Sequence, residues 1–310
     1  MIHLTDSEID TLVDFDSAIP ALERGFRQLS GGSAAVQARV RTQAGGVKLS
    51  TMGAVLPDEA VVGAKVYTTL EGQFNFVIVL FSAHDGSLLA TLDANALTRI
   101  RTAATTVLAV RALAKPGART AAIFGSGIQG AAHAHALAAH TSLTSFRIAG
   151  LGDIEALAAE LNATHGARGI EAIACDAERA VDGADVIVTA TRATGALFDG
   201  ALVAPGALVT AIGASLPTTR ELDDTLIERA SRIVVELREQ AREEAGDLLL
   251  ARPGIVRWDD IVELGDVLDG KAAGREHADD IVFYKAVGIG LQDIALAGLA
   301  WDVYRARNQA

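Results

Sequence analysis

One stretch decides how the chain folds: Thr120–Gly130, which reads TAAIFGSGIQG. Its first five residues form a short apolar run that is typical of a buried parallel strand, and an alanine-rich segment follows its last glycine. The three glycines permit a tight turn, a close approach of the backbone to a pyrophosphate, and close packing of helix on strand. The loop therefore predicts dinucleotide binding rather than a purely structural turn. Its candidate cofactor contacts are Gly125, Ser126, Gly127, Ile128, Gln129 and Gly130.

Short apolar strands alternate with helical segments from this stretch toward the C-terminus. This alternation predicts a parallel sheet with right-handed crossovers. The last segment, Ile281–Arg307, is expected to form one long helix broken near Gly288 and Gly290, with an apolar face that packs back onto the first domain. The remaining expected elements are strands at 120–124, 145–149, 185–191, 208–212 and 232–235, and helices at 129–139 and 154–164.

The region before the glycine loop has a different pattern. Thr5 and Glu8 have the spacing of a helix-capping box, and a second helix is expected over 17–28. Closely spaced strand-like stretches follow, which favours a mainly antiparallel sheet; they lie at 35–42, 47–52, 61–69, 75–82 and 87–93. A helix is expected over 95–113, and the turn formers at 115–117 end it. The predicted fold class is α/β: a Rossmann-type doubly wound parallel sheet plus an N-terminal α+β domain.

Composition narrows the class of protein. Lys plus Arg total 27 and Asp plus Glu 39, a net charge of −12 with no local basic cluster, so we expect no nucleic-acid or membrane partner. Cys175 is the only cysteine, which excludes an intrachain disulfide. We find no targeting or membrane-spanning segment and expect a cytoplasmic enzyme without a metal site.

The residue that reads the cofactor ribose is expected after the second parallel strand. Asp153 lies near the expected distance, and no arginine is there to pair with a 2′-phosphate. This favours NAD, with NADP left possible. Alternatively, Asp153 only caps the helix that follows it.

Several motifs resemble the ornithine cyclodeaminase and mu-crystallin family. They run through nearly the whole chain in the family's order: LTRIRTAA at 97–104, GSGIQ at 125–129, AIGASLP at 211–217, RELD at 220–223, GD at 246–247, ELG at 263–265 and VF at 282–283, with the segment that continues to Gly288. The resemblance implies a substrate and dimerisation domain at 1–115 and 289–310, a Rossmann domain at 116–288, an active site between the two domains, and a homodimer.

The resemblance also implies the roles of individual residues. Lys65 matches a lysine near the substrate carboxylate and imine, Arg101 matches an arginine that holds the carboxylate, and Arg39 is a further basic contact. Burial of Lys65 in its apolar strand would lower its pKa and let it exchange a proton. The alternatives are a solvated strand-edge lysine and a surface ion pair for Arg101. The positions expected to line the cofactor are Arg101, Thr102, Gln129, Thr191 and Gly213.

One residue departs from the cyclodeaminase pattern. Members that cyclise ornithine have an acid–base aspartate where this chain has Ser215, and a serine hydroxyl does not take up a proton at neutral pH. The pattern here is closer to the ketimine reductase-like members, so we expect NAD(P)-dependent reduction of a small cyclic imino acid such as pyrroline-2-carboxylate, with Lys65 and Ser215 as candidate catalytic residues. Alternatively, Ser215 only shapes a turn. The other interpretations are ornithine cyclodeaminase, an alanine dehydrogenase-like enzyme, and a mu-crystallin-like protein that only binds a dinucleotide.

Overall fold

A computed structural model describes residues 2–308, which form two compact units. The first unit contains the described residues up to Thr105 and those from Gly288 onward, and the second runs from Thr106 to Val287. The first boundary therefore falls inside helix α3 (Asn95–Leu113), whereas the sequence suggested the turn after residue 115. Because an unbroken helix carries the chain from one unit to the other, no loop marks this boundary in the sequence.

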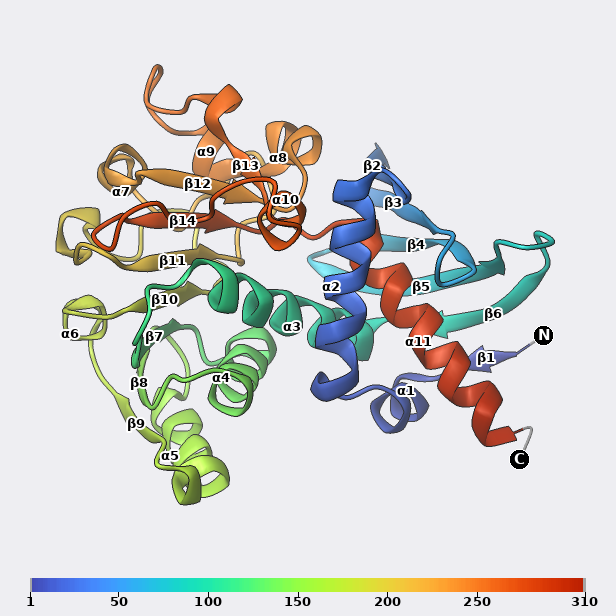
Figure 1. Cartoon of the computed structure of the whole chain (residues 1–310), viewed down its shortest axis with the longest axis horizontal. Coiled ribbons are helices and arrows are strands. Elements are labelled where there is room, and N and C mark those ends of the chain that lie inside the picture. The colour runs from blue at the N-terminus through green and yellow to red at the C-terminus, as the bar shows by residue number, and fades with distance from the viewer. Residues whose placement is uncertain (1, 309–310) are drawn as a thin grey trace. The chain divides into compact units, whose positions relative to one another are not determined.

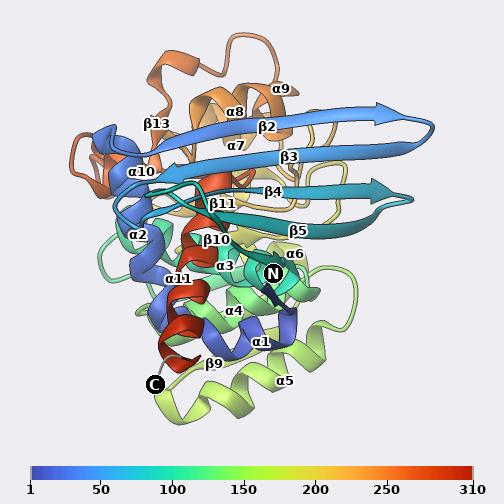
Figure 2. The same ribbon diagram turned by 90° about the vertical axis from the view of Figure 1, so that its right-hand side faces the viewer.

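The sheet of the first unit has six strands in the order β1-β6-β5-β4-β3-β2 (Figure 1), and Figure 2 shows its four long strands β2 to β5 side by side. Every neighbouring pair is antiparallel except β1 with β6, which confirms the mainly antiparallel sheet. Tight turns connect the four long strands β2 to β5. The strands are β1 (His3–Leu4), β2 (Ala35–Ala44), β3 (Val47–Leu56), β4 (Val61–Leu70), β5 (Gln73–Ser82) and β6 (Leu88–Asp93).

Helices cover one face of this sheet. Helix α11 (Gly290–Asn308) packs on β3 and β4 and also contacts α2 (Phe15–Gly31). The short α1 (Asp6–Leu12) begins with the expected capping box, in which Thr5 and Glu8 each bond to the other's backbone N–H. None of the helices within residues 2–308 has both the length and the apolar character that a membrane crossing requires.

Strand β4 shows how the two faces of the sheet differ. Lys65 and Tyr67 are buried on the face that α11 covers. Val62, Ala64 and Val66 alternate with them and are only half-buried on the opposite face. The period of two along a strand therefore places an apolar row outside and a lysine inside the first unit.

The second unit contains an eight-stranded sheet in the order β13-β12-β14-β11-β10-β7-β8-β9, with all pairs parallel (Figure 1). From β7 the order runs to β8 and β9 on one side and to β10 and β11 on the other, which is the doubly wound arrangement. The predicted Rossmann-type fold is confirmed. The strands are β7 (Thr120–Phe124), β8 (Ser145–Ala149), β9 (Glu171–Ala174), β10 (Val186–Thr189), β11 (Leu208–Ala211), β12 (Arg232–Val235), β13 (Val262–Glu263) and β14 (Val282–Lys285).

Helices connect these strands, and a mainly aliphatic core that includes three phenylalanines packs against the sheet. Phe124, Phe198 and Phe283 are buried in one apolar cluster. The helices are α4 (Ile128–His140), α5 (Ile154–His165), α6 (Ala177–Val181), α7 (Asp224–Arg229), α8 (Arg238–Glu244), α9 (Gly246–Leu249) and α10 (Leu264–Leu268).

The expectation of one long broken helix over Ile281–Arg307 was wrong in its first part. Val282–Lys285 is strand β14, buried between β11 and β12, and the helix begins only at Gly290. An apolar run of four residues fits a buried parallel strand as well as a helix turn, so periodicity alone could not decide between them. The length of the pattern distinguishes the strand from the helix, because the helical spacing of apolar residues continues over many residues only after Gly290.

Candidate active site

The glycine loop of the second unit has the geometry of a phosphate cradle. Gly125 has φ +110°, and a Cβ there would lie 2.7 Å from the carbonyl oxygen of Ala190. A Cβ on Gly130 would lie 1.9 Å from the carbonyl oxygen of Gly125, so the first turn of α4 packs directly on the loop. The position of a Cβ on Gly127 has no neighbour within 4 Å among the described residues, which leaves open space in front of the loop.

The start of α4 supplies donors to that space. Gly127 is the N-cap of α4 and makes no side-chain cap, so no side chain of the cap residue satisfies the first N–H groups of the helix. In the same turn, Gln129 Oε1 is a buried acceptor without a hydrogen-bond partner within residues 2–308, which a donor group of a ligand would satisfy and a phosphate would not. Uncapped amides at a helix N-terminus favour an anion, and the residues present therefore fit a dinucleotide pyrophosphate.

Asp153 lies directly after the loop that follows β8. Its Oδ1 accepts a hydrogen bond of 2.9 Å from the N–H of Ala156, which makes it the N-cap of α5. The capping alternative is therefore present in the structure. The second carboxylate oxygen of Asp153 takes no part in this hydrogen bond, so helix capping and ribose recognition do not exclude each other.

The remaining predicted cofactor residues lie on three segments. Thr102 is buried on α3, and its hydroxyl donates to the carbonyl oxygen of Thr98 at 2.6 Å. Thr191 follows β10 and Gly213 follows β11, and Glu221 accepts hydrogen bonds from the backbone of both. Ser215 is half-buried in the same loop as Gly213.

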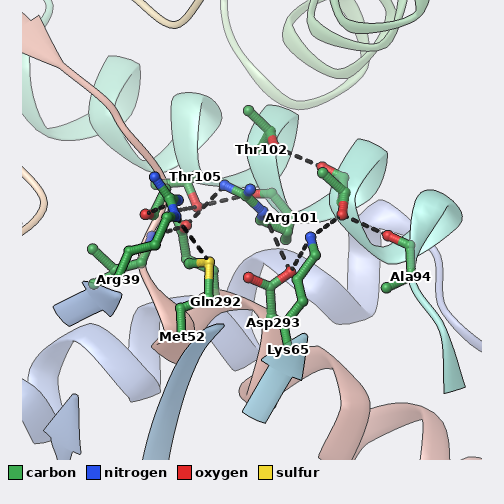
Figure 3. A network of polar contacts seen from close by, with 12 residues as sticks. Arg39, Met52, Lys65, Ala94, Arg101, Thr102, Thr105, Gln292 and Asp293 are labelled. Carbon is green, nitrogen blue, oxygen red and sulfur yellow. Dashed lines mark hydrogen bonds and ion pairs between the residues drawn. The ribbon is translucent and has the colours of Figure 1, made fainter. Parts of the chain in front are cut away.

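Lys65 is the central charge of a buried polar network in the first unit (Figure 3). Its side chain is 2% exposed, which excludes the alternative of a solvated strand-edge lysine. Nζ donates to Asp293 Oδ1 at 3.0 Å and also to the hydroxyl of Thr98. Burial lowers the pKa of Lys65 to about 8, which the attraction of Asp293 opposes and the nearby guanidinium groups of Arg101 and Arg39 reinforce. The affinity of this lysine for its proton is therefore well below that of a solvated lysine.

Arg101 belongs to the same network and is not a surface ion pair. It is buried on α3, Nη1 donates to Gln292 Oε1 at 2.9 Å, and Nε lies 3.7 Å from Asp293 Oδ1. Gln292 in turn donates to Thr105 at 2.9 Å. The bond to Gln292 holds Nη1, whereas Nε is buried without a hydrogen bond and Nη2 makes none to the described residues.

Arg39 reaches the network from β2. Its Nη2 donates to the carbonyl oxygen of Gly288 at 2.9 Å, and its Nε lies 3.4 Å from the sulfur of Met52. The structure thus brings together three predicted substrate residues, Arg39, Lys65 and Arg101, from β2, β4 and α3 (Figure 3).

Sequence reasoning missed Asp293, the only carboxylate in contact with Lys65 and Arg101 among the described residues. It is fully buried on α11, and its Oδ2 has no hydrogen-bond partner within the described chain. A signal was available: Gln292 and Asp293 interrupt an otherwise apolar helical face, and a carboxylate at such a position needs a buried cation.

The family model of the ornithine cyclodeaminase/mu-crystallin family matches residues 1–308, and the chain belongs to this family. The resemblance seen in the motifs is confirmed. Ketimine reductase mu-crystallin of Mus musculus is 34% identical over 296 residues, 92% of this chain and 91% of that protein. A Delta(1)-pyrroline-2-carboxylate reductase of Bacillus cereus is 32% identical over 259 residues, 83% of this chain and 76% of that protein.

Solved structures share the whole architecture. A probable ornithine cyclodeaminase from Bordetella pertussis Tohama I has a TM-score of 0.95 and 48% identity, covering 100% of this chain and 98% of its own. An archaeal alanine dehydrogenase dimer with bound NAD has a TM-score of 0.91 and 27% identity, covering 99% and 97%. The fold is thus shared by solved structures whose names give two different reactions.

Proposed function

We propose that the protein is an NAD(P)H-dependent reductase of a small cyclic ketimine such as pyrroline-2-carboxylate. The observation that carries the proposal is the buried cluster of Lys65, Arg101 and Asp293, which holds two cations and one carboxylate, with the half-buried Arg39 beside it. An excess of buried positive charge is costly unless an anion neutralises it. A substrate with a carboxylate beside its C=N bond supplies that anion.

Arg101 is the residue that we expect to hold the substrate carboxylate. Gln292 fixes Nη1, so the edge formed by Nε and Nη2, which has no hydrogen-bond partner in the described chain, is already oriented for a ligand. A fixed, planar pair of donors matches a carboxylate better than an ammonium group does. We assign Arg39 the role of a second basic contact to the same group.

We assign Lys65 the role of the proton donor to the substrate nitrogen. Thr98 donates its own hydroxyl proton to the carbonyl oxygen of Ala94, so its oxygen must accept from Lys65. Thr98 and Asp293 use two of the three N–H bonds of the ammonium group, and Nζ also lies 4.3 Å from the ring centroid of Phe76. We assign the third N–H bond to an imine nitrogen, which binds it more strongly than an aromatic ring does. With a pKa of about 8, Lys65 is protonated at neutral pH yet able to release its proton to the nitrogen during reduction.

The cofactor role is assigned to the second unit. When bound, the reduced nicotinamide supplies the hydride. Gly125, Gly127 and Gly130 give the close approach that the pyrophosphate needs, and Asp153 is assigned to the ribose, which favours NADH over NADPH. The similarity to an alanine dehydrogenase with bound NAD supports this assignment.

Ser215 is the residue that argues against ornithine cyclodeamination as the reaction of this protein. Its hydroxyl cannot act as a base in the way a carboxylate can, so we assign the role of proton donor to Lys65. The relatives named as ketimine and pyrroline-2-carboxylate reductases support the reductive direction.

An assay with paired substrates tests the proposal. Purified protein is mixed with NADH or NADPH and pyrroline-2-carboxylate, and the absorbance of the reduced nicotinamide is followed while proline is measured. We expect oxidation of the cofactor in proportion to proline formed. Ammonia and proline from ornithine, without net oxidation, would instead identify a cyclodeaminase, and NADH formation with alanine an alanine dehydrogenase. Tight dinucleotide binding with every substrate inert would identify a binding protein.

We also propose a homodimer formed through the outer face of the first sheet. Val62, Ala64 and Val66 of β4 lie beside Phe81, Val79 and Val77 of β5, and all are only half-buried. Folded monomers rarely leave a continuous apolar surface of this kind in water, and a second copy of the chain would cover it. The alanine dehydrogenase neighbour is itself described as a dimer.

A further inference from the structure

A second buried charge network lies at the carboxyl ends of three neighbouring strands of the Rossmann sheet. Its members are Glu221, Asp247 and Lys285, and each side chain is fully buried. Parallel strands β10, β11 and β14 are adjacent in the sheet (Figure 1) and end at Thr189, Ala211 and Lys285. The reaction proposed above does not use these charged groups, so their burial needs another explanation.

Glu221 is the centre of this network, because its carboxylate accepts four hydrogen bonds. Oε1 accepts from the N–H of Thr191 at 2.8 Å and from its hydroxyl at 2.7 Å. Oε2 accepts from the hydroxyl of Thr189 at 2.8 Å and from the N–H of Gly213 at 2.8 Å. One side chain therefore fixes the loop after β10 and the loop after β11 to each other.

Gly213 shows how closely the two loops approach at this point. A Cβ at this position would lie 2.1 Å from the carbonyl oxygen of Thr191 and 2.6 Å from Glu221 Oε1. Only a residue without a side chain fits there. The spacing of the loops is thus set by the carboxylate and leaves no room for adjustment.

Asp247 and Lys285 hold Glu221 in place. Asp247 Oδ1 accepts from the N–H groups of Glu221 at 2.7 Å and Leu222 at 3.0 Å. Asp247 Oδ2 lies 2.8 Å from Lys285 Nζ, which also donates to the carbonyl oxygen of Ala211 at 3.3 Å. A buried ion pair rooted in β14 therefore anchors the segment that carries Glu221.

The position of these loops in the sheet indicates which part of a dinucleotide they serve. The glycine loop follows β7, and β8 and β9 continue the half that binds the adenosine. Strands β10 and β11 lie on the other side of β7 and begin the half that binds the second mononucleotide, the nicotinamide half. We propose that Glu221 is a positioning residue for the nicotinamide half, and that the Asp247–Lys285 ion pair supports it.

This inference rests on the proposed dinucleotide-dependent function and refines the role of Thr191. The hydroxyl of Thr191 donates to Glu221 and accepts from the N–H of Ala193 at 3.0 Å. Its proton is therefore committed inside the protein. Thr191 presents backbone groups to the cofactor, at a place that Glu221 sets.

The variant Glu221→Gln tests the proposal without changing the size of the side chain. An amide has one acceptor oxygen and one NH₂ donor. The Thr hydroxyls can turn to suit the NH₂, but the backbone N–H groups of Thr191 and Gly213 cannot. In either orientation of the amide, one of these two N–H groups faces another donor, so one loop is released.

The measurement compares a whole cofactor with its adenosine half. Binding of NADH and of ADP-ribose is measured by calorimetry for the wild type, for Glu221→Gln and for Glu228→Gln, an exposed glutamate of α7 paired with Arg252. For Glu221→Gln we expect Kd for NADH to rise about tenfold or more, as for loss of a hydrogen bond to a charged group, while Kd for ADP-ribose stays within about twofold. The control Glu228→Gln should change neither constant.

A second variant covers the case in which Glu221→Gln fails to fold. Thr189→Val keeps the shape of a buried residue and removes one of the four donors, and it should raise Kd for NADH several-fold with ADP-ribose unchanged. Equal loss of both ligands, or no loss of either, would overturn the inference. A wild type that binds ADP-ribose and NADH but does not reduce a ketimine would refute the proposed reaction and leave the inference standing. A wild type that binds neither ligand would overturn both.

Discussion

Asp293 Oδ1 lies 3.0 Å from Lys65 Nζ, and both side chains are buried, one on α11 and one on β4. These two residues are 228 positions apart in the sequence. Their contact sets the charge and the proton affinity of the lysine, because burial lowers its pKa to about 8 and the carboxylate opposes that shift. The pair therefore makes the proposed proton transfer testable by pH.

The first prediction concerns the rate of reduction as a function of pH. If Lys65 protonates the substrate nitrogen, kcat/KM is constant below the pKa of about 8 and falls about tenfold per pH unit above it, because the deprotonated amine has no proton to give. Lys65→Arg, which stays charged at all these pH values, should react slowly and lack this fall. A fall that persists in Lys65→Arg would assign the titration to another group.

A second prediction follows from replacing Asp293. Asp293→Asn removes the attraction that raises the pKa of Lys65, so the pKa drops below 8 and the alkaline fall in kcat/KM moves to lower pH. The variant should also melt at lower temperature, because it leaves buried cations without their carboxylate. Measuring both the pH profile of kcat/KM and the thermal unfolding of the variant separates the change in pKa from the loss of stability. An unshifted profile in a folded variant would contradict the assigned coupling.

The third prediction concerns substrate affinity. Arg101→Lys loses the planar pair of donors, so KM for pyrroline-2-carboxylate should rise about 10- to 100-fold, with a smaller change in Kd for NADH. Arg99→Lys is a matched control on the same helix but outside the network, since Arg99 pairs with Asp10 at the surface. A larger loss in NADH binding than in substrate affinity would assign Arg101 to the cofactor instead.

Elements whose bounds are set by a local sequence pattern could be predicted from the sequence. Thr120–Phe124 and Asn95–Leu113 have the predicted bounds, because a glycine loop or a proline turn ends each pattern. The apolar strand around Lys65 indicated burial but left a solvated strand-edge lysine as an alternative, and the structure decides for burial. Val282–Lys285 was not, since a short apolar run carries no period of its own.

Residues whose partners are distant in the sequence could not be predicted in this way. Glu221 and Asp247 lie in motifs that indicate the family, yet nothing local shows that the backbone of Glu221 binds Asp247. Asp293 forms its contacts only when α11 lies on the sheet of the first unit. Such networks depend on the register of packed elements, which the pattern of one element does not contain.

A fourth prediction tests the dimer. Val79→Lys places a charge in the centre of the apolar outer face of the first sheet, and the protein should become a monomer by analytical ultracentrifugation. Ile173→Lys is the control, because Ile173 is an exposed apolar residue of β9 in the second unit. A dimer that survives Val79→Lys, or a wild type that sediments as a monomer, would refute the proposed interface.

The final prediction separates the two roles of Asp153. Asp153→Ser keeps a good N-cap for α5 but removes the carboxylate, whereas Asp153→Ala removes both. Loss of the cap costs about 1 kcal/mol, so Asp153→Ala should melt about 2 °C lower while Asp153→Ser stays close to the wild type. If the carboxylate also reads the ribose, both variants should lose preference for NADH over NADPH, because the negative charge no longer repels a 2′-phosphate. A preference that survives in both variants would leave Asp153 with the capping role alone, and the ratio of the two Kd values in each variant is the deciding measurement.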